Sequence, residues 1–121
     1  MKVLAIRFCT VTPEVDALAK FFDNLGLPRM PLPDFGAEGA GITGAIFPAG
    51  ASWIEMWGAG PQMPVGVMLQ VVVDDADAFA AHARSNGLEP MGPTDAHGER
   101  IYFLSAPSGL QMSFQSRLAG P

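Results

Sequence analysis

The chain has 121 residues, of which 49% are hydrophobic and 16% are charged, and its formal net charge is −5 at pH 7. This length suits one domain, and the high apolar and low charged content supports a packed core and excludes intrinsic disorder. Lysine and arginine form no cluster anywhere in the sequence, which excludes nucleic acid as a partner.

The N-terminal segment, MKVLAIRFCTV, is interrupted by an arginine and lacks the long apolar run and the small-residue cleavage site of a signal peptide. No segment approaches the roughly 20 apolar residues of a membrane span. The single cysteine, Cys9, cannot form an internal disulfide bond and fits a reducing compartment. We therefore expect a cytoplasmic protein with no membrane partner.

The first predicted element is a strand at residues 2–11, where apolar and mixed positions alternate with period two. Leu4, Ile6 and Phe8 share one side of this strand. We expect this apolar side to form the core that a helix covers.

A helix follows, with Thr12 as its N-cap and Pro13 at its first position, and Gly26 ends it. The apolar residues between them recur at helical spacing. Two short strands are then predicted at about 43–48 and 51–58.

The same order of elements repeats in the second half of the chain. The elements are, in order, a strand at 65–73, a helix capped by Asp74 or Asp75 and ended by Gly87, a segment broken by Pro90, Gly92 and Pro93, and strands at 100–104 and 110–115. The helix segments ALAKFFDNLGL and AFAAHARSNGL also align without gaps. Each half has one helix for one face of its sheet, so the other face is available to the partner half. We expect a single domain with an α+β fold, made of module 1–60 and module 65–121, with a groove for a small molecule.

Four segments, in this order, resemble the vicinal-oxygen-chelate superfamily of glyoxalases, bleomycin-resistance proteins and extradiol dioxygenases. They are TVTPEVDALAKFFDNLGL, WIEMW, QVVVDDADAFAAHARSNGL and GERIYFLSAPSGLQMSF. The resemblance covers nearly the whole chain. It implies two βαβββ modules in tandem that form a curved mixed sheet around a small-molecule cavity, usually in a homodimer.

Metal-dependent members of this superfamily hold a divalent ion with four inward side chains, typically His or Glu. The resemblance places Glu55 at the fourth-strand position, Met68 at the fifth and Ser113 at the eighth. The first-strand position falls on Ile6 or Arg7, depending on one gap. Methionine and arginine do not suit a hard cation. The resemblance therefore implies a protein without a metal cofactor, in which Glu55 is the only retained ligand-type residue.

Alternation also assigns to each of four strands a mixed face, opposite the apolar face. Large apolar walls with a few polar groups are typical of small-ligand pockets. The ligand-binding residues that we predict on these faces are Arg7, Trp53, Glu55, Trp57, Met68, Gln70, Gln111 and Ser113.

Several of these residues have two possible roles. Arg7 could pair with Glu55 and hold ligand carboxylate or carbonyl oxygens where the cation would lie, or it could be a structural partner of Glu55 or reach solvent. Trp53 and Trp57 could stack on an aromatic or cationic ligand, or pack in the core or a dimer interface. Glu55 and His97 are the candidates for acid–base catalysis, although His97 also fits a solvated loop residue.

The function that this pattern favours is a metal-free small-molecule binding protein, similar to the bleomycin-resistance branch and working as a homodimer. The alternative is a metal-dependent lyase, isomerase or dioxygenase of the same superfamily that uses Glu55. A metal-free enzyme with Glu55 as general base, and a domain whose main activity is dimerisation, are further hypotheses.

Overall fold

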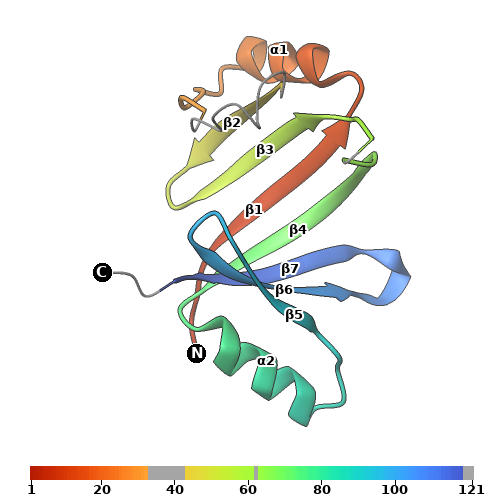
Figure 1. Ribbon diagram of the computed structural model, residues 1–121. Helices are drawn as coiled ribbons and strands as arrows, with labels where there is room; N and C mark the ends of the chain where they lie inside the picture. The colour runs from red at the N-terminus through yellow and green to blue at the C-terminus, as the bar shows by residue number, and fades with distance from the viewer. Residues whose placement is uncertain (33–42, 62, 119–121) are drawn as a thin grey trace. The chain divides into compact units, whose positions relative to one another are not determined.

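The computed structural model describes residues 1–32, 43–61 and 63–118, and Figure 1 shows the arrangement of helices and strands. The described chain is an α+β protein with two α-helices and seven strands. The elements are β1 (Val3–Thr12), α1 (Val15–Leu25), β2 (Gly44–Ala49), β3 (Ser52–Gly58), β4 (Gly66–Val73), α2 (Ala76–Ser85), β5 (Met91–Ala96), β6 (Glu99–Ser105) and β7 (Gln111–Arg117). Within the described residues, no helix has the length and apolar character that a membrane crossing requires.

The chain divides into two compact units. The α1 unit is Phe8–Val67, and the α2 unit is Met1–Arg7 together with Met68–Pro121, so that β1 contributes to both. The strand order is β2-β3-β1 in the α1 unit and β1-β4-β7-β6-β5 in the α2 unit. The second half of the chain therefore has the complete βαβββ order that the resemblance implied.

In the α1 unit, the helix packs on β2 and β3, which are antiparallel partners (Figure 1). Alternation along β3 turns Ile54 and Met56 toward this helix, as predicted. The buried core consists of Val15, Ala19, Ala45, Phe47 and Met56. Burial of these apolar side chains is the main force that holds α1 on its two strands.

Helix α1 begins two residues later than the sequence predicted. Its N-cap is Glu14, and the Thr12 hydroxyl instead accepts a hydrogen bond from the backbone N–H of Glu14, at 3.1 Å. Thr12 is thus the last residue of β1, and its side chain stabilises the turn into the helix. The predicted C-terminal glycine, Gly26, is confirmed by its left-handed backbone with φ of 107°.

In the α2 unit, the helix packs on β6 and β7 (Figure 1). Tyr102 and Phe114 form a buried core with Ala76 and Ala80 of this helix. Its N-cap is Asp75, one of the two candidates from the sequence, and its side chain accepts a hydrogen bond from the backbone N–H of Ala78 at 3.1 Å. Strand β4 runs parallel to β7, and β7 runs antiparallel to β6.

Asp77 in the first turn of α2 anchors this helix to β6. It accepts a hydrogen bond from the Tyr102 hydroxyl at 2.5 Å and pairs with Arg100 at 2.9 Å. The pKa of Asp77 is lowered, first by the Tyr102 hydroxyl and then by the Arg100 guanidinium. Because residues 100 and 102 face the helix side, residues 99, 101 and 103 face the opposite side of the sheet.

The segment around Pro93 forms a strand, whereas the prolines predicted a break. Strand β5 pairs with β6 at the end of the strand order, and its register shifts between Met91 and Thr94. A proline is tolerated on an edge strand because its missing N–H need not serve a second neighbour. The sequence prediction was therefore wrong about this segment.

The expected core face of β1 is also wrong. Leu4, Ile6 and Phe8 are 55%, 48% and 43% exposed, while Ala5 and Cys9 on the other side are buried. The cause is where the helices pack, because α1 lies on β2 and β3 and α2 lies on β6 and β7. An apolar strand face is thus left without a helix over it.

The core of the α1 unit offers a direct test of this packing. We expect Phe47→Ala, at a side chain only 1% exposed, to lower the free energy of unfolding by about 3–5 kcal/mol. Phe21→Ala is the matched control, because Phe21 is 61% exposed, and it should cost well under half as much. Urea unfolding followed by circular dichroism measures both values. Equal losses in the two variants would contradict the assignment of this core.

Candidate functional site

The face of β3 opposite α1 carries a carboxylate that receives three hydrogen bonds. The indole N–H of Trp53 donates to Oε1 of Glu55 at 3.1 Å, and that of Trp57 donates to Oε2 at 2.6 Å. The Cys9 thiol on β1 is the third donor. We call Cys9, Trp53, Glu55 and Trp57 the Glu55 cluster, and all four belong to the α1 unit.

A glycine on β2 makes room for this cluster. Gly44 pairs with Trp57 across the two strands, and a Cβ at position 44 would overlap the indole ring. The ring therefore lies against the β2 backbone, and Trp57 is buried while Trp53 is half-buried. This packing holds the Trp57 indole N–H on the carboxylate.

Burial raises the pKa of the Cys9 thiol to about 12, and the Glu55 carboxylate contributes through repulsion and through the hydrogen bond that it accepts. A thiol with such a pKa stays protonated at neutral pH and is a poor nucleophile. Cys9 is therefore a buried hydrogen-bond donor to Glu55.

A second set of polar side chains lies on the face of the α2 unit's sheet opposite α2, which we call the network face. Arg7 and Glu99 form a two-pronged ion pair, with Nη1 to Oε1 at 2.9 Å and Nη2 to Oε2 at 3.1 Å. Their side chains are only 15% and 18% exposed. A guanidinium and a carboxylate that match in this way form one of the stronger polar contacts in proteins.

The ion pair continues into a chain of hydrogen bonds. Nε2 of Gln115 donates to Glu99 at 3.3 Å and, over a long 3.4 Å, to Oε1 of Gln70. The Ser113 hydroxyl donates to Oε1 of Gln115 at 2.7 Å. Ser113 and Gln115 are 1% and 3% exposed. We call Arg7, Gln70, Glu99, Ser113 and Gln115 the Arg7 network.

Strand register explains why these side chains meet. Ser113 pairs with Gln70 on β4 and with Phe103 on β6, so the three side chains lie side by side on the network face. Met68 on β4 pairs with Gln111 and shares this face two residues from Gln70. The network is thus bordered by apolar side chains.

The predicted ligand-binding residues fall into three groups. Trp53, Glu55 and Trp57 belong to the Glu55 cluster, and Arg7, Gln70 and Ser113 belong to the Arg7 network, with Met68 beside it. Gln111 is exposed at the end of the β6–β7 hairpin, where its Nε2 donates to the Ser105 hydroxyl at 2.9 Å. The catalytic candidate His97 is exposed on the β5–β6 turn, with φ of 54°.

The expected pair of Arg7 with Glu55 stays a prediction, because the two residues belong to different units. Within its own unit Arg7 binds Glu99, which the sequence analysis missed together with Gln115. The signal for Gln115 was its position two residues from Ser113 on the same strand face. The signal for Glu99 was its alternation with Ile101 and Phe103, which the loop sequence before it obscured.

The four positions implied for a metal do not provide a suitable set of ligands. Both oxygens of Glu55 accept indole N–H groups, and the Ser113 hydroxyl donates to an amide. The first-strand position offers either the aliphatic side chain of Ile6 or Arg7, which holds a carboxylate. Met68 supplies only a thioether, which suits soft metals. Among the residues described, no three His, Cys, Asp or Glu side chains come together as metal ligands.

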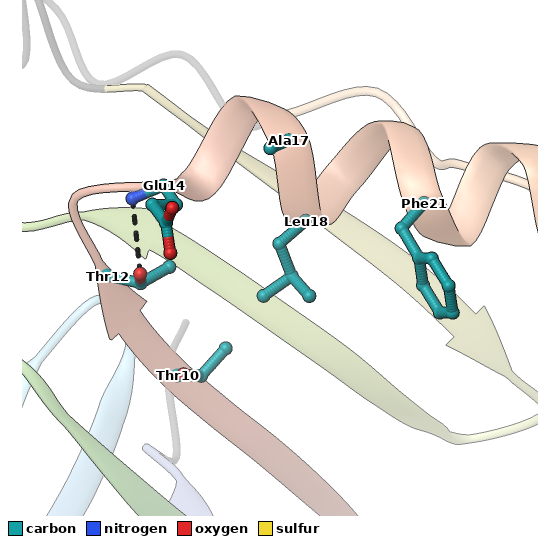
Figure 2. A pocket seen from close by; sticks show the side chains of 6 residues that line it. All are labelled: Thr10, Thr12, Glu14, Ala17, Leu18 and Phe21. Carbon is teal, nitrogen blue, oxygen red and sulfur yellow. Dashed lines mark hydrogen bonds between the residues drawn. The ribbon is translucent and has the colours of Figure 1, made fainter.

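A recess of about 360 Å³ lies in the α1 unit between the end of β1 and helix α1 (Figure 2). Its lining residues are Thr10, Thr12, Glu14, Ala17, Leu18 and Phe21. None of them was predicted as a site residue. Glu14 and Phe21 are exposed, so this recess is open to water and gives a small ligand little burial.

The raised pKa of Cys9 predicts a pH dependence. The unfolded chain releases the thiol proton near pH 9, whereas the native chain holds it until about pH 12. The native state then binds more protons in this window, so the free energy of unfolding should fall as the pH rises from 9 to 12. We expect a shallower fall in Cys9→Ala, measured by urea unfolding below pH 9 and at several values above it. Equal slopes in the two proteins would show that Cys9 is not linked to folding.

Comparison with known proteins gives similarity at the level of structure. No family model and no curated protein matches the chain. Methylmalonyl-CoA epimerase from Mycobacterium tuberculosis has a similar structure, with a TM-score of 0.70 at 18% identity over 97% of this chain and 90% of that chain.

Two further solved structures are similar. A glyoxalase/bleomycin resistance protein/dioxygenase superfamily member from Vibrio splendidus 12B01 has a TM-score of 0.63 at 12% identity, over 95% of this chain and 99% of that chain. Glyoxalase I from Zea mays has a TM-score of 0.63 at 12% identity, over 94% of this chain but 43% of that chain. The chain therefore has the glyoxalase-like fold of the vicinal-oxygen-chelate superfamily, as its sequence motifs predicted.

Proposed function

We propose that this chain is a small-molecule binding protein of the glyoxalase and bleomycin-resistance type, which holds its ligand without a metal ion. The observation that carries the proposal is the Arg7 network. Burial of a guanidinium, a carboxylate and two amides costs free energy that apolar side chains of similar size would not cost. Such an arrangement on a face that no helix of its unit covers supports a role in recognising a ligand.

The network also indicates which ligands suit it. Arg7 and Glu99 neutralise each other, so the network carries no net charge to attract a highly charged ligand. Met68 and Phe103 on the same face provide apolar contacts. These features support a small, largely apolar molecule with a few polar atoms.

The proposal of a metal-free protein is supported by the occupied donor atoms. A metal ion at Glu55 would have to displace two indole N–H groups, and the other implied positions offer it a guanidinium, a thioether and a hydroxyl. A hard cation binds weakly to such a set. We therefore assign no catalytic step to a metal in this chain.

Ligand binding and metal content can be tested together. We expect protein purified without chelators to hold no stoichiometric metal by elemental analysis. A panel of neutral, anionic and cationic aromatic molecules should contain ligands that bind equally well with and without EDTA, as measured by isothermal titration calorimetry.

Matched serine variants distinguish this site from nonspecific binding. Ser113→Ala leaves Oε1 of Gln115 without its donor, so we expect ligand binding to weaken about 5–10-fold. Ser85→Ala, at an exposed helix end, should have no effect. A stoichiometric metal whose removal abolishes binding would overturn the metal-free proposal, and equal binding by the two variants would place the site elsewhere.

A homodimer is part of this proposal. Its support is the outer face of β1, where Leu4, Ile6 and Phe8 expose about half of their surface side by side. Contiguous apolar surface of this kind is typical of protein interfaces, and this side of the strand carries no charged residue from position 4 to position 12. Two chains that each carry a net charge of −5 associate most readily through such an uncharged face.

The dimer can be tested by sedimentation equilibrium. We expect the protein to sediment as a dimer and Phe8→Asp to sediment as a monomer, because the substitution places a charge on the apolar face. Phe21→Asp is the matched control, since Phe21 is exposed on α1, and it should remain dimeric. A monomeric parent protein would overturn the dimer, and a dimeric Phe8→Asp variant would place the interface on another face.

A further inference from the structure

The direction of the hydrogen bonds in the Arg7 network is fixed from one end. A guanidinium has only donors and an ionised carboxylate has only acceptors. Arg7 must therefore donate and Glu99 must accept in each hydrogen bond that they form. Gln115 lies 3.3 Å from Glu99 and must therefore turn its NH₂ group, not its carbonyl, toward the carboxylate.

This orientation of Gln115 determines the next contacts. Its carbonyl oxygen points to Ser113, whose hydroxyl donates to it at 2.7 Å. Its remaining N–H points to Gln70 and requires an oxygen there, which is Oε1 at 3.4 Å. With the amide of Gln70 reversed, two NH₂ groups would face each other and no hydrogen bond could form.

The NH₂ group of Gln70 is consequently turned away from the network. Among the residues that the structure describes it has no acceptor, and it is not one of the fully buried polar atoms without a partner, so part of its surface is accessible to water. The Gln70 side chain is half-buried, with Ser113 beside it and Met68 two residues away on the same face. A buried ion pair thus places a hydrogen-bond donor at the edge of an apolar surface.

We propose that Gln70 recognises the ligand as a hydrogen-bond donor, and that Arg7 and Glu99 fix this polarity through Gln115. The ligand atom that it contacts is an acceptor oxygen, such as a carbonyl, on an apolar body that lies against Met68 and Phe103. This inference rests on the proposed function, because it names the kind of ligand that the network face accepts. Gln70 is the specificity-determining residue, and Glu99 and Gln115 are positioning residues.

Two probes of similar size separate acceptors from donors. Acetophenone carries a carbonyl oxygen and no donor, and benzylammonium carries donors and no acceptor. We expect acetophenone to bind at least about fivefold more tightly, the value of one hydrogen bond, and to shift the side-chain amide signals of Gln70 in ¹⁵N-labelled protein. Tighter binding of benzylammonium through the same amide would overturn the inference.

Substitutions test the role of Gln70 and the hydrogen bonds that link it through Gln115 to Glu99. Gln70→Glu replaces the donor by an acceptor of the same shape, so the preference between the two probes should reverse. Asn24→Asp makes the same change of amide to carboxylate on the exposed surface of α1 and should leave the preference unchanged. Glu99→Gln replaces a carboxylate, which only accepts hydrogen bonds, by an amide that can either donate or accept. We expect the preference between the two probes to become smaller. The dispersion of the backbone amide signals should show that this variant is folded. An unchanged preference in Gln70→Glu would contradict the role of Gln70.

The direction of these hydrogen bonds can also be tested by hydrogen exchange in the protein without a probe. Both side-chain N–H protons of Gln115 should exchange slowly with water, because each has an acceptor, whereas those of Gln70 should exchange fast. Equal protection of the two amides would overturn the inference even if ligands bind. If neither probe shifts any signal while the exchange pattern is as expected, the proposed binding function fails and the polarity of the network stands.

Discussion

The ion pair between Arg7 and Glu99 is the constraint on which the polar half of this structure depends. Two charges taken out of water destabilise a protein unless they meet in good geometry and their remaining atoms are hydrogen-bonded. Here the geometry is two-pronged, and Gln115 gives Glu99 a further donor. Once the pair is in place, an apolar residue at position 115 would remove a hydrogen-bond donor from the Glu99 carboxylate, and an apolar residue at position 113 would leave Oε1 of Gln115 without its donor. The serine and the amides on this face follow from that requirement.

Much of the fold could be predicted from the sequence, because both helices and six of the seven strands have strong local signals. Alternation also assigned the correct faces of β3 and β7. It failed on β1, where Leu4, Ile6 and Phe8 form a regular apolar side that no helix covers. Which strand lies beneath a helix is decided by tertiary packing, which local periodicity cannot reveal. The edge strand around Pro93 was missed because a proline reads as a break unless the position of the strand in the sheet is known.

The candidate site was predicted in part for the same reason. Alternation placed the mixed-face residues of β3, β4 and β7 opposite the faces that pack with the helices, as in the structure, but it could not predict their hydrogen-bond partners. Glu99 lies 92 positions from Arg7 in the sequence, and only the pairing of β6 with β7 brings it to the network face. Glu55 likewise read as a surviving metal ligand. In the structure its two oxygens are held by the flanking tryptophans, an arrangement that strand alternation makes possible at i ± 2.

The Glu55 cluster and the Arg7 network each stabilise a partly buried carboxylate, but they do so with different partners. This difference is relevant to ligand specificity. Glu55 is stabilised by neutral donors, two indoles and a thiol, and the Trp57 indole is held by packing against the β2 backbone. Glu99 is stabilised by a cation, and its neighbours are amides, which can turn over. An amide presents either a donor or an acceptor, and only a fixed neighbour decides which. Under the proposed function, the neutral pair of Arg7 and Glu99 in the α2 unit would select a ligand through the direction of a hydrogen bond and not through net charge.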